Sequence, residues 1–308
     1  MEAEIGIEPD QLTDSRTNRT MPLRGRHAII TGAGLGLGAC ITEHYVAAGA
    51  SVMLCARDES RLRGLSERLA PQLIEGQEIL FRHADVAVRA DMDALVEETI
   101  ESFGKIDVLV NNAGVYGPFG AIEDIDWDEW VHAMEINVLG TVYPCRLVVP
   151  QMKRQGYGKI VNLSGGGATN PLPRVSAYAA SKAAVVRFTE SLALEVSEYH
   201  IDVNAVAPGA LNTRMMEQLV SAGPERVGEA FYQRMLKVRD DGGVPLDVGA
   251  TLCVWFGSAE SDGITGRLIS APWDSWRDLP KHVAELAQSD LYTLRRIEPK
   301  DRNLDWSK

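Results

Sequence analysis

Short apolar runs alternate with helical stretches from Arg26 onward, and this alternation constrains the fold more than any other feature of the sequence. The runs that read as buried strands occupy residues 27–31, 51–55, 78–83, 106–110, 159–163 and 202–207. Helical stretches lie between these runs. The first follows residues 27–31 and ends near residue 48, and the others lie at 59–69, 91–103, 127–154 and 176–199. Such alternation favours a parallel sheet that helices cover on both faces. Right-handed crossovers then predict a doubly wound α/β fold.

The chain is predicted to form a single domain with extensions at both ends. Of its 308 residues 45% are hydrophobic, and doubly wound sheets often fill about 250 residues as one unit. We place that domain at residues 21–270. Residues 1–20 are acidic and polar and contain no apolar signal segment, so we expect a disordered arm. Residues 210–245 break the alternation and are expected to form a substrate lid, whereas residues 271–308 are expected to pack on the domain or a neighbouring subunit.

Charge and cysteine usage exclude several classes of function. A net charge of −12 repels phosphate backbones, which argues against nucleic-acid binding. No stretch approaches the ~18 apolar residues of a membrane span. The four cysteines, Cys40, Cys55, Cys145 and Cys253, form no CxxC pair, and the sequence contains neither HExxH nor GxSxG. We therefore expect a cytoplasmic protein without a metal site, a disulfide framework or a hydrolase centre.

A glycine-rich segment, Thr31-Gly-Ala-Gly-Leu-Gly-Leu-Gly38, follows the first strand and opens the first helix. In this position glycines permit a tight turn and let backbone N–H groups approach a pyrophosphate at the helix N-terminus. The alternative is a glycine turn with only a structural role. The strand and helix on either side favour a dinucleotide site.

The end of the second strand bears on the choice of dinucleotide. The carboxylate that would bind the ribose 2′-OH of NAD is replaced by Ala56, and Arg57 follows. An arginine there accommodates the 2′-phosphate of NADP. We therefore favour NADP(H) over NAD(H), although Arg57 could equally be a solvated surface charge and Asp58 lies beside it.

Tyr178 and Lys182 lie four residues apart at the start of a long helical stretch, so both project from one helix face. A tyrosine with an ordinary pKa of about 10 is a poor base at neutral pH. A nearby ammonium group would lower that pKa and create a usable proton donor and acceptor. Taken alone, the pair could also be an ordinary surface pair.

Further motifs strengthen the assignment. Asn111-Asn-Ala-Gly114 follows the fourth strand, Asn137 lies in Glu-Ile-Asn-Val, and Pro208-Gly209 precedes Thr213. Together with the glycine turn and the Tyr–Lys pair, in this order, they resemble the short-chain dehydrogenase/reductase family over about residues 26–270. The resemblance implies a Rossmann-type fold and hydride transfer between NAD(P) and a carbonyl or alcohol. It also implies a homodimer or homotetramer that pairs through the helices near 127–154 and 176–199.

The resemblance also implies roles for individual residues. Tyr178 would be the acid–base, and Lys182 would also hold the nicotinamide ribose. Asn137 would hold a water in the proton relay, unless it caps a kink in its helix. Asp85 would contact the adenine and Thr213 the carboxamide, and Asn111 would border the cofactor or brace its strand. The implied cofactor site comprises Gly32, Gly34, Leu35, Gly36, Leu37, Gly38, Arg57, Asp85, Val86, Asn112, Ala113, Gly114, Tyr178, Lys182, Pro208, Gly209 and Thr213.

The chain departs from the family at its substrate-orienting serine. That serine usually lies thirteen residues before the tyrosine, where this sequence has Gly165. Ser164 lies one residue earlier, followed by three glycines that could form a bulge and let its hydroxyl reach the substrate carbonyl. We expect Ser164 to serve as the fourth catalytic residue; the alternative is another donor or none. Ser176 lies too close to the tyrosine and is expected to cap its helix.

The sequence thus predicts an NAD(P)(H)-dependent oxidoreductase that acts on a small carbonyl or alcohol substrate. Two alternatives stay open. One is a catalytically weak NAD(P)-binding regulatory protein, suggested by the displaced serine and the tail. The other is an epimerase or dehydratase of the same family. The lid and tail would determine the substrate, and no general code relates such segments to one.

Overall fold

The computed structural model describes residues 13–14 and 19–306 of the chain. Its centre is a seven-stranded sheet in the order β5-β4-β3-β6-β7-β8-β9, with every neighbouring pair parallel. The strands are β3 (His27–Thr31), β4 (Ser51–Ala56), β5 (Ile79–His83), β6 (Val108–Asn111), β7 (Gly158–Leu163), β8 (Ile201–Ala207) and β9 (Leu268–Ser270). The predicted doubly wound α/β fold is confirmed, and of the strands of this sheet only the three-residue edge strand β9 was not anticipated.

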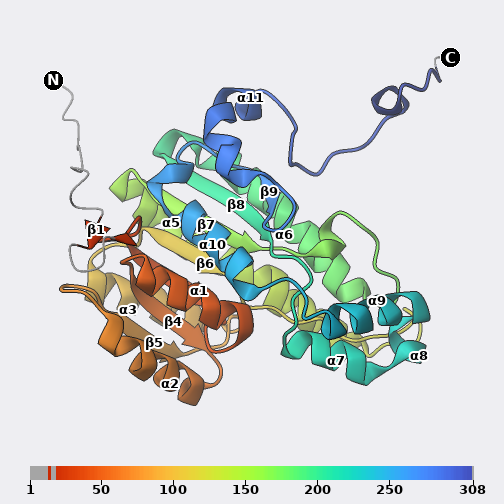
Figure 1. The fold of residues 1–308 in the computed structure, drawn as a ribbon, viewed down its shortest axis with the longest axis horizontal. Coiled ribbons are helices and arrows are strands. Elements are labelled where there is room, and N and C mark those ends of the chain that lie inside the picture. The colour runs from red at the N-terminus through yellow and green to blue at the C-terminus, as the bar shows by residue number, and fades with distance from the viewer. Residues whose placement is uncertain (1–12, 15–18, 307–308) are drawn as a thin grey trace.

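Helices cover both faces of this sheet (Figure 1). One layer contains α1 (Gly36–Ala47), α2 (Glu59–Leu69) and α10 (Leu246–Gly257); the other contains α3 (Arg89–Phe103), α4 (Trp127–Met134), α5 (Gly140–Gln155) and α6 (Ser176–Glu195). Strand side chains alternate between the two layers. On β3, Ala28 and Ile30 belong to the core under α1 and α10, whereas Ile29 packs under α3 and α5. Burial on both faces explains why the strands read as continuous apolar runs.

The strand order places the ligand-binding edge of the sheet. From β3 the chain winds outward through β4 to β5, then crosses back to β6 and winds the other way to β9. The switch lies between β3 and β6, which pair directly. In open parallel sheets the loops after the strands separate at such a point and leave a crevice at their carboxyl ends. The glycine turn follows β3, and the Asn111–Gly114 segment follows β6.

Residues 210–245 form a small helical unit at this edge (Figure 1). It comprises α7 (Arg214–Ala222), α8 (Pro224–Val227) and α9 (Glu229–Asp240). Met216, Leu219, Val227 and Met235 give it an apolar cluster of its own. An antiparallel bridge between Leu211 and Gly243 joins the two ends of the unit.

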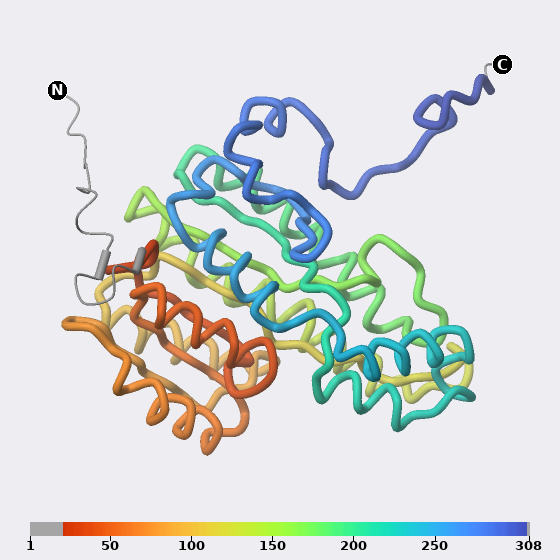
Figure 2. The backbone as a smooth tube through the Cα atoms, viewed as in Figure 1, coloured from red at the N-terminus to blue at the C-terminus, as the bar shows by residue number. Residues whose placement is uncertain are grey.

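The two terminal regions differ in how far the structure describes them. The predicted disordered arm falls mostly on residues outside the described part, although β1 (Thr13–Asp14) and β2 (Arg19–Thr20) pair antiparallel. The C-terminal extension packs on the domain through Trp276, which is buried with its ring 5.3 Å from that of Trp255. Beyond residue 294 the chain extends away from the domain (Figure 2).

Within the described residues, the structure contains no helix that is both apolar enough and long enough to cross a bilayer.

Candidate active site

A cavity of about 950 Å³ lies at the carboxyl edge of the sheet, between the strand loops and the α7–α9 unit. It brings together all seventeen residues of the cofactor site inferred from sequence, from Gly32 to Thr213, together with Ser164. Asn111 and Asn137 are not part of its wall. The sequence thus identified one continuous pocket, with a glycine turn at one end and the Tyr–Lys pair further along.

Side-chain hydrogen bonds hold the glycine turn on one side, and the turn lines the cavity on the other. Asn112 donates from Nδ2 to the carbonyls of Thr31 (3.0 Å) and Gly32 (3.1 Å). A Cβ at Gly38 would lie 2.1 Å from the Gly32 carbonyl oxygen, so only glycine fits there. Helix α1 begins after Leu35, whose side chain gives it no cap. Its first N–H groups are therefore left for an anion, which fits a cofactor pyrophosphate.

Two arginines line the cavity just beyond the end of β4. Strand β4 ends at Ala56, and Arg57, Asp58 and Arg61 line the cavity after it. Asp58 is the N-cap of α2, accepting from the Arg61 backbone N–H (3.3 Å) and from its Nε (2.8 Å). Arg57 lies 3.9 Å from a carboxylate oxygen of Asp85, also in the cavity wall. The Asp58 carboxylate, which lies beside the two arginines, thus caps the N-terminus of α2.

Helix α6 presents Tyr178 and Lys182 to the cavity. The Lys182 ammonium donates to the Leu163 carbonyl (2.7 Å) and lies 5.7 Å from the centre of the Tyr178 ring. Burial lowers the pKa of Lys182 to about 8. Burial, with a smaller contribution from Tyr116, raises the pKa of Tyr178 above its ordinary value. This is opposite to the lowering expected from Lys182, because the loss of solvent outweighs the nearby ammonium. At neutral pH the Tyr178 hydroxyl therefore carries its proton and can donate it.

Ser164 directly follows β7, and the β7–β8 ladder is regular up to this residue. The Ser164 N–H donates to the Val206 carbonyl (2.8 Å), which continues the regular β7–β8 ladder. Gly165 therefore faces the tyrosine, and a Cβ there would lie 2.2 Å from Tyr178 Oη. The Ser164 hydroxyl is buried and has no hydrogen-bond partner in the described part of the chain. A substrate-orienting role for Ser164 stays a prediction.

Tyr116 is a site residue that the sequence reasoning missed. Its ring centre lies 4.8 Å from that of Tyr178 at an interplanar angle of 59°, and it lines the cavity. Burial raises its pKa to about 12. Its hydroxyl forms no hydrogen bond with any described residue. The available signal was its position, two residues after the Asn111–Gly114 motif.

The two asparagines outside the cavity wall brace it. Asn137 lies in a π-helical turn (Glu135–Leu139), where its amide donates to the Val115 carbonyl and accepts from the Val115 N–H, both at 2.8 Å. It thus occupies the expected kink, while its part in a proton relay stays a prediction. Asn111 donates to Asn162 Oδ1 (2.9 Å) and joins β6 to β7, which matches the strand-bracing alternative.

The expectation that Ser176 caps its helix is wrong. Ser176 is the first helical residue of α6, and its hydroxyl accepts from Trp130 Nε1 (3.2 Å).

The C-terminal extension adds one aromatic residue to the cavity wall. Trp273 is 73% exposed and lines the cavity, whereas Trp276 is buried in the core.

Comparison with known proteins agrees with this geometry. A family model described as short chain dehydrogenase matches residues 26–223. The chain is 33% identical to an L-fucose dehydrogenase of Oryctolagus cuniculus over 243 residues, which is 79% of this chain and 82% of that protein. It resembles the structure of a gluconate 5-dehydrogenase from Burkholderia cenocepacia J2315 in complex with NADP and tartrate (TM-score 0.71, 29% identity, 81% and 94% coverage). It also resembles an NAD⁺-bound xylitol dehydrogenase (TM-score 0.72, 26% identity, 80% and 98% coverage). The chain therefore belongs to the short-chain dehydrogenase/reductase family and is an NAD(P)-dependent oxidoreductase that interconverts a carbonyl and an alcohol.

Proposed function

We propose that this oxidoreductase uses NADP(H), with Tyr178 as its acid–base, on a substrate that combines an apolar body with an anionic group. The observation that carries the proposal is the single cavity: the uncapped N-terminus of α1 and the Tyr178 hydroxyl open into the same space. A dinucleotide with its phosphates at the first would extend toward the second.

The chain's own groups handle the proton. Bound nicotinamide would supply or accept the hydride at the substrate carbon. Tyr178, protonated at neutral pH, donates its proton to the carbonyl oxygen during reduction; in the oxidation direction its phenolate form would accept the proton of the alcohol. The Lys182 ammonium, held by the Leu163 carbonyl, stabilises the phenolate that remains and is the nearest source of a replacement proton.

Arg57 and Arg61 support the choice of NADP(H). Both guanidinium groups line the cavity beyond β4, and Ala56 leaves that strand end without a carboxylate. Asp58 would repel a 2′-phosphate, but its negative charge is offset by Arg61 at 2.8 Å. A phosphate between the two guanidinium groups would gain charge-assisted hydrogen bonds that a 2′-hydroxyl cannot match.

Tyr116 supplies the hydrogen bond that the family serine would otherwise make. Gly165 carries no hydroxyl, and the Ser164 hydroxyl is buried. The Tyr116 ring packs against that of Tyr178, and its hydroxyl has no hydrogen-bond partner among the described residues, so it can donate to a substrate. Two tyrosine O–H groups would then converge on one substrate oxygen, an arrangement that stabilises developing negative charge. Ser164 is the second candidate, because its own hydroxyl lacks a partner.

The lid side of the cavity indicates the substrate class. The side chains that line it there are mostly apolar: Leu211, Met215, Met216, Phe231, Met235 and Val238. Arg234 lines the same region over Phe231, with its guanidinium carbon 4.9 Å from the ring centre. It forms no ion pair with any carboxylate of the described residues. An apolar ketone or alcohol with a carboxylate would use both features.

A matched pair of ketones tests the proposal. With NADPH, 4-oxocyclohexanecarboxylate should be reduced with a kcat/KM at least about tenfold above that of cyclohexanone. Arg234→Met should remove this difference by raising the KM of the acid only, and Tyr178→Phe should abolish turnover of both. Cofactor binding without turnover on any carbonyl or alcohol would indicate the regulatory alternative. Product formed without net cofactor consumption would indicate an epimerase or dehydratase.

We also infer a homo-oligomer. Leu139, between α4 and α5, and Leu194, near the end of α6, are 55% and 79% exposed. They lie on the helical stretches at which the resemblance places the subunit contact. Light scattering coupled to size exclusion should give at least twice the 33.7 kDa of one chain, and Leu194→Glu should shift the protein toward the monomer.

A further inference from the structure

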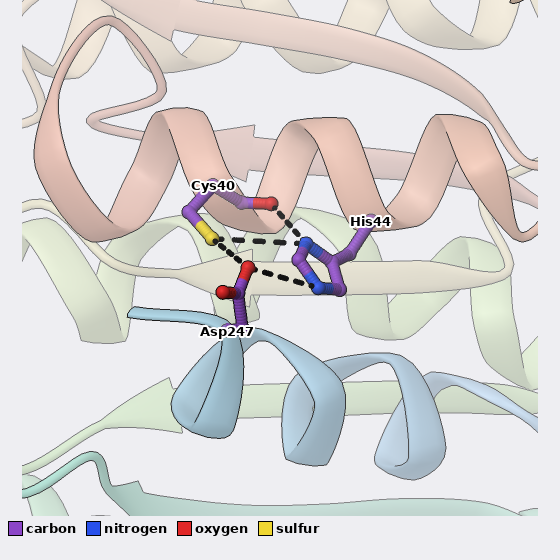
Figure 3. A group of neighbouring side chains, drawn as sticks. All are labelled: Cys40, His44 and Asp247. Atoms are coloured by element: carbon purple, nitrogen blue, oxygen red, sulfur yellow. Dashed lines mark hydrogen bonds and ion pairs between the residues drawn. The ribbon is translucent and has the colours of Figure 1, made fainter. Parts of the chain in front are cut away.

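Cys40, His44 and Asp247 form a cluster between α1 and α10, outside the active-site cavity (Figure 3). Cys40 and His44 lie one turn apart on α1, and Asp247 is in the first turn of α10. Cys40 Sγ lies 3.5 Å from Asp247 Oδ1, and His44 Nε2 lies 3.4 Å from the same oxygen. None of the three lines the cavity, and the dehydrogenase chemistry uses none of them.

We propose that this cluster is a binding site for a divalent transition-metal ion of the zinc type. Sulfur, nitrogen and oxygen ligands sit roughly 2.0–2.3 Å from zinc, so in a tetrahedron they are separated by about 3.4–3.6 Å. The two separations above match this spacing. One ligand atom from each residue lies within 4.8 Å of the others, so small side-chain rotations bring all three to one ion.

The histidine is already oriented as a ligand. Its Nδ1 lies 2.9 Å from the Cys40 carbonyl oxygen, to which it donates (Figure 3). The neutral ring then carries its lone pair on Nε2, the nitrogen that faces Asp247. A backbone carbonyl that fixes the second ring nitrogen is the usual support of metal-binding histidines.

The charges around the thiol favour a cation. The Asp247 carboxylate lies 3.5 Å from the Cys40 sulfur, and Glu43 adds a second negative charge nearby on α1. When the ion binds, the thiol releases its proton to solvent and the sulfur–metal bond forms. Thiolate and carboxylate together then neutralise the two positive charges. The Asp247 side chain is 74% exposed, which leaves an entry path and a fourth position for water. Thiolate and imidazole select against Mg²⁺ and Ca²⁺, which prefer oxygen ligands.

The ion would join two segments that border the active site. Helix α1 carries the glycine turn at its N-terminus, and α10 begins directly after the lid unit. The sequence predicted no metal site because Cys40 and Asp247 are 207 residues apart and no cysteine pair is present. Only the packing of α1 on α10 brings the three ligands together.

Cobalt binding to the full chain, stripped of metal and kept reduced without thiols, tests the proposal. One Co²⁺ per chain should bind with a thiolate-to-cobalt charge-transfer band and with the strong visible bands of a four-coordinate ion, and Zn²⁺ should displace it. Cys40→Ser should abolish the charge-transfer band. Asp247→Asn, at the exposed end, should weaken Co²⁺ binding at least about tenfold. Zn²⁺ should raise the melting temperature of the wild-type protein, whereas Mg²⁺ should not.

Two control variants separate this site from adventitious binding. His282 and Glu285 form a surface imidazole–carboxylate pair without a thiol, and Cys145 is a buried thiol elsewhere in the core. His282→Ala and Cys145→Ala should leave the cobalt spectrum unchanged. A charge-transfer band that survives Cys40→Ser, or a wild-type protein without such a band, would overturn the proposal. If Cys40→Ser fails to fold, unchanged affinity in Asp247→Asn overturns it equally.

Discussion

The Tyr178 hydroxyl occupies the space directly over Gly165: a Cβ on that glycine would lie 2.2 Å from Oη. The family resemblance places the substrate-orienting serine at this position, so this chain lacks that donor here and the tyrosine hydroxyl lies against the glycine backbone instead. The contact explains why residue 165 is a glycine, and it makes this position a sensitive neighbour of the reacting tyrosine.

A side chain at residue 165 should therefore lower activity, and by different amounts in two similar variants. Gly165→Ala must displace Tyr178 Oη by more than about 1 Å, and a misplacement of that size can cost about a hundredfold in kcat. Gly165→Ser causes the same displacement but adds a hydroxyl where the family has one, so it should retain more activity. Steady-state kinetics with one ketone measures both. Equal activity of the alanine variant and the wild type would contradict the contact.

The Tyr116 hydroxyl should matter more than that of Ser164. Tyr116→Phe keeps the ring contact with Tyr178 but removes the donor, and loss of one such donor lowers kcat about a hundredfold. Ser164→Ala removes a buried hydroxyl that has no partner, so it should change kcat less than about threefold and leave stability unchanged or slightly higher. The reverse order of effects would assign the orienting role to Ser164, as the sequence suggested.

The rate of carbonyl reduction should fall as pH rises through about 8. Burial lowers the pKa of Lys182 to that value, so the ammonium group that supports the Tyr178 phenolate is lost above it. The pH profile of kcat/KM, measured with saturating cofactor, should show this fall as a descending limb above about pH 8. Lys182→Arg, which stays charged throughout the range, should lower the rate but remove the limb. A wild-type profile that stays level well above pH 8 would contradict the assignment.

The preference for NADPH should depend on Arg57. Arg57→Ala removes a charge-assisted bond to the 2′-phosphate, so kcat/KM with NADPH should fall about ten- to a hundredfold while that with NADH changes little. Arg63 provides the matched control: it lies six residues further along the chain, on α2, pairs with Glu59 and does not line the cavity. An equal loss with both cofactors would show that Arg57 does not discriminate between them.

The parts of the site that sequence predicted are those set by local geometry. Gly32, Gly38 and the Tyr178–Lys182 spacing have their physical meaning within a few residues, so they can be recognised without a structure. Tyr116 lies near Tyr178 because of how the loop after β6 crosses α6. Asp247 lies near Cys40 because of how α10 packs on α1. Ser164 shows a limit of sequence reasoning: its distance from the tyrosine suggested a bulge, whereas the structure places Gly165 against the Tyr178 hydroxyl and gives the Ser164 hydroxyl no partner among the described residues.

Lys182 should cost the protein stability at neutral pH. The lowering of its pKa from 10.5 to about 8 corresponds to about 3 kcal/mol at most. This penalty is present in full below pH 8 and is relieved as pH rises toward 10.5, because the unfolded chain then loses its extra proton too. Lys182→Met removes the buried charge, which stabilises the protein. It also leaves the Leu163 carbonyl without a hydrogen bond, which costs about 1–3 kcal/mol of stability. Urea unfolding should show the variant about 1 kcal/mol more stable at neutral pH and less stable than the wild type near pH 10.5.

Lys237→Met, on the exposed face of α9, provides the control: it should change the free energy of unfolding by less than about 0.5 kcal/mol at either pH. A Lys182→Met variant that is less stable at neutral pH would show that the hydrogen bond to Leu163 outweighs the buried charge.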